Sequence, residues 1–215
     1  ITTKELDRLA ESLILDFGAK PSFKGYEGYP AALCTSVNEQ IVHAIPSDRK
    51  LQEGDLLSLD LGVFYRDFHA DMAITVPVGE VSHEAQRLIR ATKKALKRGI
   101  KKARPGNTFG DVSNTIERHI KAQGFGVVRE LCGHGIGREL HQEPQILNYG
   151  KRGKGAKIET GMCFCLEPML SAGSWRIKKS EDGYGYETED GSLSAHFEHT
   201  LTAGEEKCRV LTKIK

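Results

Sequence analysis

Two acidic residues interrupt the most apolar stretches of this sequence and constrain its fold more than any other feature. Asp60 lies inside the run from Leu56 to Leu61, and Asp71 lies inside the run from Phe68 to Ile74. A buried carboxylate without a partner costs on the order of several kcal/mol, so each should be paired, protonated or bound to a metal. The spacing of eleven positions lets a hairpin over 55–65 and 69–78 bring both to one face. Two like charges side by side require a cation.

Two glutamates repeat the anomaly later in the chain. Glu167 ends the apolar run that begins at Met162, and Glu198 interrupts the predicted strand 193–202. With 161–170 as a further predicted strand, four acids lie in four strands. The alternative is that each acid forms a salt bridge. No Lys or Arg occurs within four positions of Asp71, Glu167 or Glu198, so such partners must come from elsewhere in the chain.

A nitrogen ligand is available at His134, where flanking glycines let the backbone approach a site closely. A phosphate-binding glycine loop is the competing interpretation, but position 138 is Arg and no Lys-Ser/Thr pair follows. The four carboxylates, at −1 each, sum to −4 and match two divalent cations. Oxygen donors with one imidazole suit Mn²⁺, Fe²⁺, Co²⁺ or Zn²⁺. The set predicts a two-metal hydrolase with a bridging hydroxide as nucleophile.

Apolar periodicity predicts three helices. The first covers 2–17, with Thr2 and Glu5 at capping-box spacing, and the second covers 82–104. The third begins at Thr108, and its pattern repeats that of the first at a constant offset of 106 positions, which indicates an internal duplication. Together with strand-like residues 127–133, these elements predict an α+β domain with a mainly antiparallel sheet and helices packed on one face. We expect loops or an exposed hairpin at 148–157 and 178–190.

Charge and cysteine content exclude several classes of protein. The 31 basic and 29 acidic side chains are too balanced for a protein that mainly holds a phosphate backbone. Five cysteines without paired spacing indicate neither a disulfide framework nor a structural zinc site. No run approaches the ~20 apolar residues of a membrane span, and no signal-peptide pattern is present. We therefore expect a soluble cytoplasmic protein without membrane contact. The basic face within 93–104 is expected to be solvated, with ribosomal RNA as the alternative partner.

The five candidate ligands, with the segment 38–46 upstream, resemble those of the type I methionine aminopeptidases over essentially the whole chain. The ligand pattern alone marks the wider pita-bread superfamily, which includes prolidases and X-Pro aminopeptidases. The segment 38–46 and the absence of the large N-terminal domain of prolidases narrow the resemblance to the methionine-specific branch. It implies a pita-bread fold with halves related by a pseudo-two-fold axis, and a single catalytic domain over 1–215.

The resemblance also implies the roles of the ligands. Asp60 would chelate one metal with both oxygens, Asp71 and Glu198 would bridge both metals, and His134 and Glu167 would complete the second. Glu167 would in addition act as general acid and base for the attacking water. His43 and His141 would contact the substrate amine, the scissile amide or the tetrahedral intermediate. We expect the other histidines to be satisfied surface or core residues: His69, His83, His119, His196 and His199.

A methionine pocket follows from the same resemblance. Its residues would be Tyr26, Tyr29, Cys34, Leu140 and Tyr184. The sequence departs from the family at Leu140, where an aromatic residue is common, and at Tyr184, where Trp is common. Phe23 takes a place often held by a small residue, and Met72 follows Asp71 where Thr or Ser is usual. A monovalent cation site near Asn38 and Ser194 is a further implication.

The implied activity is removal of the initiator methionine from nascent proteins by a monomeric enzyme with two divalent metal ions, in contact with the ribosome. Two alternatives remain: an aminopeptidase for X-Pro peptides, and a non-catalytic module that binds peptides. Relatives also have a helix ahead of the one starting at Thr2. Because the chain begins one helix late, we expect an apolar groove beside that helix.

Overall fold

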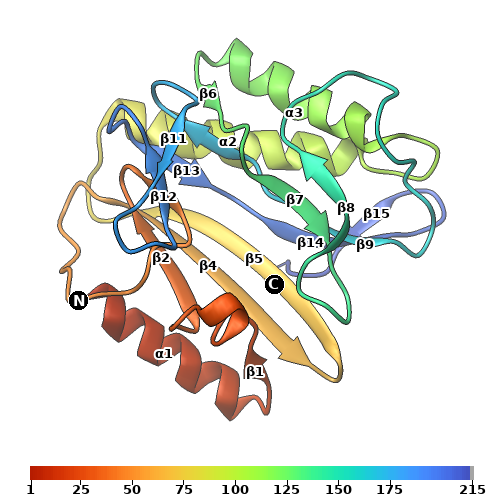
Figure 1. The fold of residues 1–215 in the computed structure, drawn as a ribbon. Helices are drawn as coiled ribbons and strands as arrows, with labels where there is room; N and C mark the ends of the chain where they lie inside the picture. Colours follow the sequence, from red (N-terminus) through yellow and green to blue (C-terminus); the bar gives the residue numbers. More distant parts are fainter. Residues whose placement is uncertain (214–215) are drawn as a thin grey trace.

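The computed structural model describes residues 1–213, a mixed α+β fold built mostly from antiparallel strands. Its helices are α1 (Thr3–Asp16), α2 (His83–Lys102) and α3 (Phe109–Ala122). The first two agree with the predicted helices to within two residues at each end, and the third begins one residue after Thr108. Figure 1 shows α1 on one side of the strands and α2 and α3 together on the other.

The helix starts support the predicted duplication. Thr2 and Glu5 form a complete capping box at α1, and Thr108 and Asp111 form the same box at α3. In each box, the threonine hydroxyl accepts from the backbone N–H three residues on, and the acidic side chain accepts from the threonine N–H. The two boxes lie 106 positions apart, at the offset that the sequence predicts.

The strands fall into four groups. A 3₁₀ turn at Tyr26–Gly28 precedes β2. The strands, in chain order, are β1 (Lys20–Pro21), β2 (Leu33–Val37), β3 (Gln40–Val42), β4 (Leu56–Tyr65), β5 (Phe68–Pro77), β6 (Gly126–Val127), β7 (Cys132–Gly135), β8 (Gln142–Leu147), β9 (Cys163–Leu166), β10 (Met169–Ser171), β11 (Ile177–Lys179), β12 (Tyr186–Thr188), β13 (Ser194–His196), β14 (His199–Ala203) and β15 (Cys208–Val210). In one group β4 pairs with β5, β1 and β2, and in another the order is β15-β14-β9-β7-β8.

The predicted hairpin near 178–190 consists of β11 and β12, and β12 also pairs with β3.

Two predicted strands are broken at the glutamates. The prediction of continuous strands over 161–170 and 193–202, with the acids inside them, is wrong: β9 ends before Glu167 and β13 ends before Glu198. Pro168 has no N–H to donate to a ladder, so pairing stops beside Glu167. The two breaks face each other, because β9 pairs with β14 and β10 pairs with β13. The predicted strand 127–133 is likewise divided, between β6 and β7.

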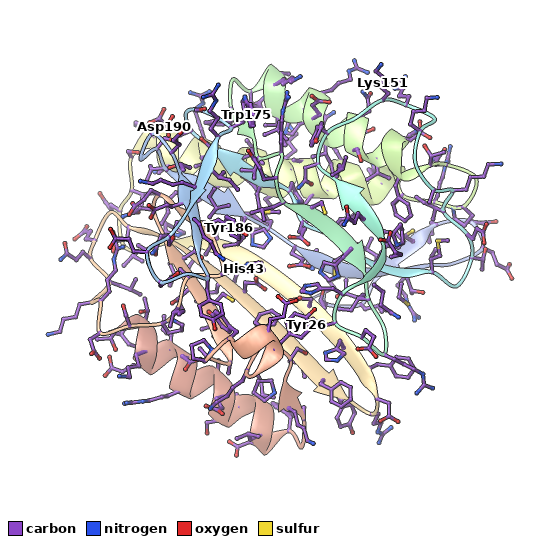
Figure 2. All side chains as sticks on the ribbon, viewed as in Figure 1. Tyr26, His43, Lys151, Trp175, Tyr186 and Asp190 are labelled. Carbon is purple, nitrogen blue, oxygen red and sulfur yellow. The ribbon has the colours of Figure 1, made fainter. Side chains whose placement is uncertain are left out.

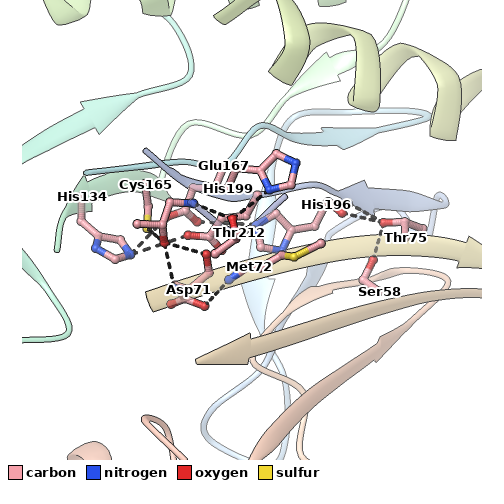
Figure 3. Close-up of polar contacts among 12 residues, drawn as sticks. Ser58, Asp71, Met72, Thr75, His134, Cys165, Glu167, His196, His199 and Thr212 are labelled. Atoms are coloured by element: carbon pink, nitrogen blue, oxygen red, sulfur yellow. Dashed lines mark hydrogen bonds and ion pairs between the residues drawn. The ribbon is translucent and has the colours of Figure 1, made fainter. Parts of the chain in front are cut away.

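The two halves of the fold meet along a seam between β5 and the β13–β14 segment. Glu198 N donates to Ala73 O at 2.8 Å, midway between two threonine contacts. On one side, Thr200 Oγ1 accepts from the backbone N–H of Asp71 and donates to its carbonyl, both at 2.8 Å. On the other, Thr75 Oγ1 does the same for His196, also at 2.8 Å (Figure 3). Threonine hydroxyls therefore replace ladder hydrogen bonds at two places along the seam.

The largest core cluster lies between the sheet and the α2–α3 pair. Its fully buried side chains include Leu88 of α2, Ile116 and Ile120 of α3, and Phe164 of β9.

On the opposite side, α1 and the outer faces of β4 and β5 border an apolar groove of about 470 Å³. Leu9 and Leu13 of α1 line it and are half exposed, so the apolar groove expected from the sequence is present. Over residues 1–213, no helix combines the length and apolar character needed to cross a membrane.

Candidate metal centre

A single cavity of about 520 Å³ collects all the predicted site residues. The five candidate ligands line it, together with His43, His141 and the five side chains of the predicted methionine pocket. Residues from β2, β4, β5, β7, the two strand breaks and the β11–β12 hairpin thus meet in one place. Figure 2 shows Tyr26, His43 and Tyr186, from three separate segments, in the middle of the molecule.

Asp60 and Asp71 lie on one face of the β4–β5 hairpin, as the spacing predicts. Asp60 is opposite Ala73 and Asp71 is opposite Gly62, so the two aspartates are diagonal neighbours. Both are buried, at 7% and 3% exposure, and Asp60 Oδ1 has no hydrogen-bond partner among the described residues. Burial raises the pKa of Asp71 to about 6. Burial and the charge of Asp71 raise the pKa of Asp60 well above its ordinary value.

Glu167 and Glu198 reach the same cluster from the two strand breaks. Glu198 is 2% exposed, and its Oε1 has no partner in the described part of the chain. Asn148 Nδ2 donates to the carbonyl of Glu167 at 3.0 Å and fixes the backbone there. Burial and neighbouring carboxylates raise the pKa of both glutamates well above the ordinary value. Glu198 places a carboxylate oxygen within 4.8 Å of those of Asp60 and Asp71, and Glu167 lines the same cavity.

His134 projects from β7 into this cluster. Its Nδ1 lies 2.9 Å from the carbonyl oxygen of Gly135, and its Nε2 lies 3.6 Å from Glu167 Oε1 and 3.9 Å from Glu198 Oε1. The flanking glycines are required by space: a Cβ on Gly133 would meet the backbone oxygen of Cys165, and one on Gly135 would meet that of Glu143. Burial lowers the pKa of His134 to about 4, which leaves a neutral imidazole with Nε2 toward the carboxylates.

These residues fit divalent metal ions. The salt-bridge alternative fails, because no Lys or Arg between residues 1 and 213 pairs with Asp60, Asp71, Glu167 or Glu198. Buried oxygens without partners in a cluster of like charges need either protons, which the raised pKa values of these carboxyls favour in the metal-free chain, or cations bound from outside it. Three overlapping groups place their ligand atoms within 4.8 Å of one another: Asp60, Asp71, Glu198; Glu167, His196, Glu198; and His134, Cys165, Glu198. Glu198 belongs to all three.

His141 and His43 lie at the wall of the cavity. The His141 ring is 4.4 Å from the His134 ring, centroid to centroid, in an edge-to-face arrangement. Tyr26 Oη lies 2.9 Å from His141 Nδ1, so the tyrosine is hydrogen-bonded to this histidine as well as lining the cavity. His43 takes a left-handed backbone conformation, with φ at +59°, directly after β3. It packs edge-to-face against Tyr186, with ring centroids 6.2 Å apart.

An apolar pocket adjoins the carboxylates. Cys34 lies opposite Asp60 in the β2–β4 register and is 4% exposed. It belongs to a buried cluster with Phe23, Tyr29 and Leu140, against which Tyr184 packs. The Tyr29 hydroxyl donates to Ala44 O at 3.0 Å and the Tyr184 hydroxyl donates to Gly28 O at 2.9 Å. The hydroxyls are therefore bonded to backbone, and the rings are free to form apolar walls.

The sequence prediction missed two residues near the site. His196 was expected to be a satisfied residue, which is wrong: it is 1% exposed, and neither ring nitrogen has a hydrogen-bond partner within residues 1–213. Burial lowers its pKa to about 3. The sequence signal that could have identified His196 is its position two residues before the candidate ligand Glu198. Tyr186 lines the cavity from a segment that was expected to be loop or hairpin, where no ligand pattern could identify it.

Asn38 and Ser194, the expected neighbours of a monovalent cation, do lie together. Ser194 Oγ donates to the carbonyls of Asn38 and Gln40, each at 2.8 Å. The Asn38 side chain is bonded to Asp55 Oδ1 and to the backbone N–H of Leu56. The side chains of Asn38 and Ser194 therefore have hydrogen-bond partners within the chain.

Comparisons with known proteins agree with this geometry. A model of metallopeptidase family M24 matches residues 1–205. A methionine aminopeptidase of Clostridium perfringens is 47% identical over 215 residues, which are 100% of this chain and 86% of that protein. The crystal structure of methionine aminopeptidase from Rickettsia prowazekii superposes with a TM-score of 0.98 at 37% identity, covering 99% of this chain and 86% of that one. The prolidase from Pyrococcus furiosus, at 24% identity, shares the fold, with a TM-score of 0.78 over 100% of this chain and 56% of that one. The pita-bread fold implied by the sequence resemblance is thus confirmed.

Proposed function

Because the chain belongs to metallopeptidase family M24, we propose that it removes the N-terminal methionine from peptides and newly made proteins, with two divalent metal ions bound at the carboxylate cluster. One observation carries the proposal: an apolar pocket and a cluster of buried carboxylates share a single cavity. Cys34 and Asp60, paired across β2 and β4, join the two. A side chain in the pocket would therefore place its own peptide bond at the cluster.

The sequence resemblance assigns the ligands, and their positions and charges are consistent with it. Asp60 would hold one cation and His134 and Glu167 the other, and the resemblance implies that Asp71 and Glu198 would be shared by both. When bound, such a pair would supply Lewis-acid activation of an amide carbonyl and would lower the pKa of the attacking water. The −4 charge of the carboxylates is balanced by two divalent ions. Mn²⁺, Fe²⁺, Co²⁺ and Zn²⁺ all suit this donor set, and availability selects among them.

Glu167 is the proposed general acid and base. It lies between His134 and His196 and is the most accessible of the four carboxyls, with 13% of its side chain exposed toward the cavity. Its carboxylate takes a proton from the attacking water and delivers it to the nitrogen of the departing amine. A carboxyl whose pKa is raised by burial binds a proton more readily than an exposed one, which suits both steps.

His141 and His43 act on the substrate. His141 lies beside His134 and would donate a hydrogen bond to the carbonyl oxygen as negative charge develops there. His43, packed against Tyr186, would contact the peptide nitrogen of the scissile bond. Neither side chain needs to move far, because both already line the cavity.

The pocket of Tyr26, Tyr29, Cys34, Leu140 and Tyr184 would receive the methionine side chain. An unbranched thioether adapts to an apolar slot bounded by aromatic rings and a thiol. Lys179 and Gly183 border the entrance, where the following residues of the substrate would leave. The substrate would be the N-terminus of a nascent protein in the cytoplasm. The enzyme would act on it as a monomer near the ribosome. The basic face within 93–104 on α2, expected to be solvated, would be the surface for that contact in the alternative case.

A panel of peptides tests the proposal. With a divalent metal present, the protein should hydrolyse Met-Ala-Ser and release free methionine, and acetylation of the amine should abolish cleavage. Ala-Pro peptides should be poor substrates, because alanine leaves the apolar pocket empty. A preference for Ala-Pro would replace the proposal by X-Pro aminopeptidase activity. Absence of cleavage of every peptide, with metal bound, would favour a peptide-binding module.

A further inference from the structure

His196 is a buried imidazole that the proposed reaction leaves without a role. Its side chain is almost fully enclosed, yet neither Nδ1 nor Nε2 has a hydrogen-bond partner among residues 1–213. Buried polar groups are nearly always satisfied, so an exception requires an explanation such as an ion. The surroundings of His196 supply one, because two carboxylates of the cluster face its ring.

The distances place His196 and His134 on two sides of the same pair of glutamates. His134 Nε2 lies 3.6 Å from Glu167 Oε1 and 3.9 Å from Glu198 Oε1. His196 Nε2 lies 3.7 Å from Glu167 Oε2 and 3.9 Å from Glu198 Oε2. All four separations exceed a hydrogen bond. They match two ligand atoms that each lie about 2.0–2.2 Å from a shared cation.

The seam gives a second, independent argument. A constant offset of 125 in residue number relates the two sides of the seam: Thr75 corresponds to Thr200, and Asp71 corresponds to His196. Each threonine hydroxyl bonds to both the backbone N–H and the carbonyl of its partner: Thr200 to those of Asp71, and Thr75 to those of His196 (Figure 3). His196 therefore occupies, in the second half of the fold, the place that Asp71 occupies in the first.

The donor count supports the same conclusion. With His196 included, the cluster has four carboxylates and two imidazoles, a set that holds two divalent ions in carboxylate-bridged centres of other folds. The added imidazole is neutral and leaves the charge balance unchanged. We propose that His196 supplies a second nitrogen ligand to the centre, holding a divalent cation against Glu167 Oε2 and Glu198 Oε2. This inference deepens the proposed function and rests on it.

Zinc titration of protein labelled with ¹⁵N in its eight histidines tests the proposal directly. Zn²⁺ is diamagnetic, so coordination is read from the ring nitrogen signals. We expect two Nε2 signals to move into the metal-bound range by two equivalents of Zn²⁺. His196→Gln should remove one of them and weaken one of the two binding events at least about tenfold by calorimetry. His119→Gln is the matched control, because His119 of α3 is buried, its Nε2 has no partner among the described residues, and it is not among the residues that line the cavity.

Circular dichroism establishes that each variant folds, and His196→Asn replaces the glutamine variant where it does not. The inference is overturned when only one Nε2 signal moves in the unaltered protein and His196→Gln binds zinc with unchanged affinity. In that case the centre still binds metal and the proposed function stands. Absence of any zinc binding would contradict the inference and the proposed function together.

Discussion

Asp60 and Asp71 are diagonal neighbours on one face of the β4–β5 hairpin, and no cationic side chain of residues 1–213 pairs with either. Two ionised carboxylates buried this closely destabilise the folded chain unless a proton or a bound cation neutralises them. The residues proposed to bind metal therefore lower the stability of the metal-free protein, and its free energy of unfolding reports on the carboxylate cluster.

Asp71→Asn should stabilise the metal-free protein. Burial raises the pKa of Asp71 to about 6, so at pH 7.5 its ionised form carries a cost that the amide avoids. We expect the free energy of unfolding to rise by roughly 1–3 kcal/mol, since each pKa unit corresponds to about 1.4 kcal/mol. Urea unfolding in chelator measures it. The variant should gain no stability from added metal, and equal or lower metal-free stability would contradict the account of the cluster.

The stability of the metal-free protein should fall as pH rises above the ordinary pKa of histidine, about 6.5. Asp60, Glu167 and Glu198 have pKa values raised well above the ordinary range, so the folded state binds more protons than the unfolded state. Stability then decreases with pH. Below pH 6.5, the lowered pKa values of His134 and His196 act in the opposite direction. Thermal unfolding between pH 6.5 and 8.5 checks this, and saturating metal should flatten the slope. A rise with pH in chelator would refute it.

Glu167→Gln should keep the fold and the metals but lower turnover by about 10²–10⁴-fold, because an amide cannot carry a proton from water to the leaving amine. Its KM for Met-Ala-Ser should change little. Turnover and metal content are measured on the same sample. Glu159→Gln, at an exposed surface position, is the control. Turnover near that of the control would remove Glu167 from the role of acid and base.

Tyr26→Phe tests whether the tyrosine orients His141. Removing the 2.9 Å contact to His141 Nδ1 frees the ring and its choice of tautomer. We expect kcat to fall about three- to tenfold, the usual value of one hydrogen bond. In a His141→Ala background the same change should cost nothing more. An additive loss in the double variant, or a change confined to KM, would return Tyr26 to the methionine pocket alone.

The sequence identifies ligands better than it identifies how the backbone presents them. Asp60 and Asp71 were predictable because alternation in a regular hairpin fixes which side chains share a face. Glu167 and Glu198 were predicted as ligands but placed inside strands. The interruption at Pro168 and the change of pairing partner depend on contacts between segments about thirty positions apart in the chain.

His196 shows the limit most clearly. A lone histidine in an apolar run is indistinguishable from a satisfied core residue until the seam with Thr75 is known. Tyr186 and the Tyr26–His141 contact are likewise products of tertiary packing, which no local pattern encodes.

The central claim is that the carboxylate cluster cuts peptides through bound divalent metal. The most direct measurement is release of methionine from Met-Ala-Ser by protein stripped with chelator and then given Co²⁺, Mn²⁺, Fe²⁺ or Zn²⁺ one at a time. We predict negligible release without metal and recovery with at least one ion within two equivalents, but not in Asp71→Asn. Full release from the stripped protein, or recovery in the variant equal to that of the unaltered chain, would contradict the account.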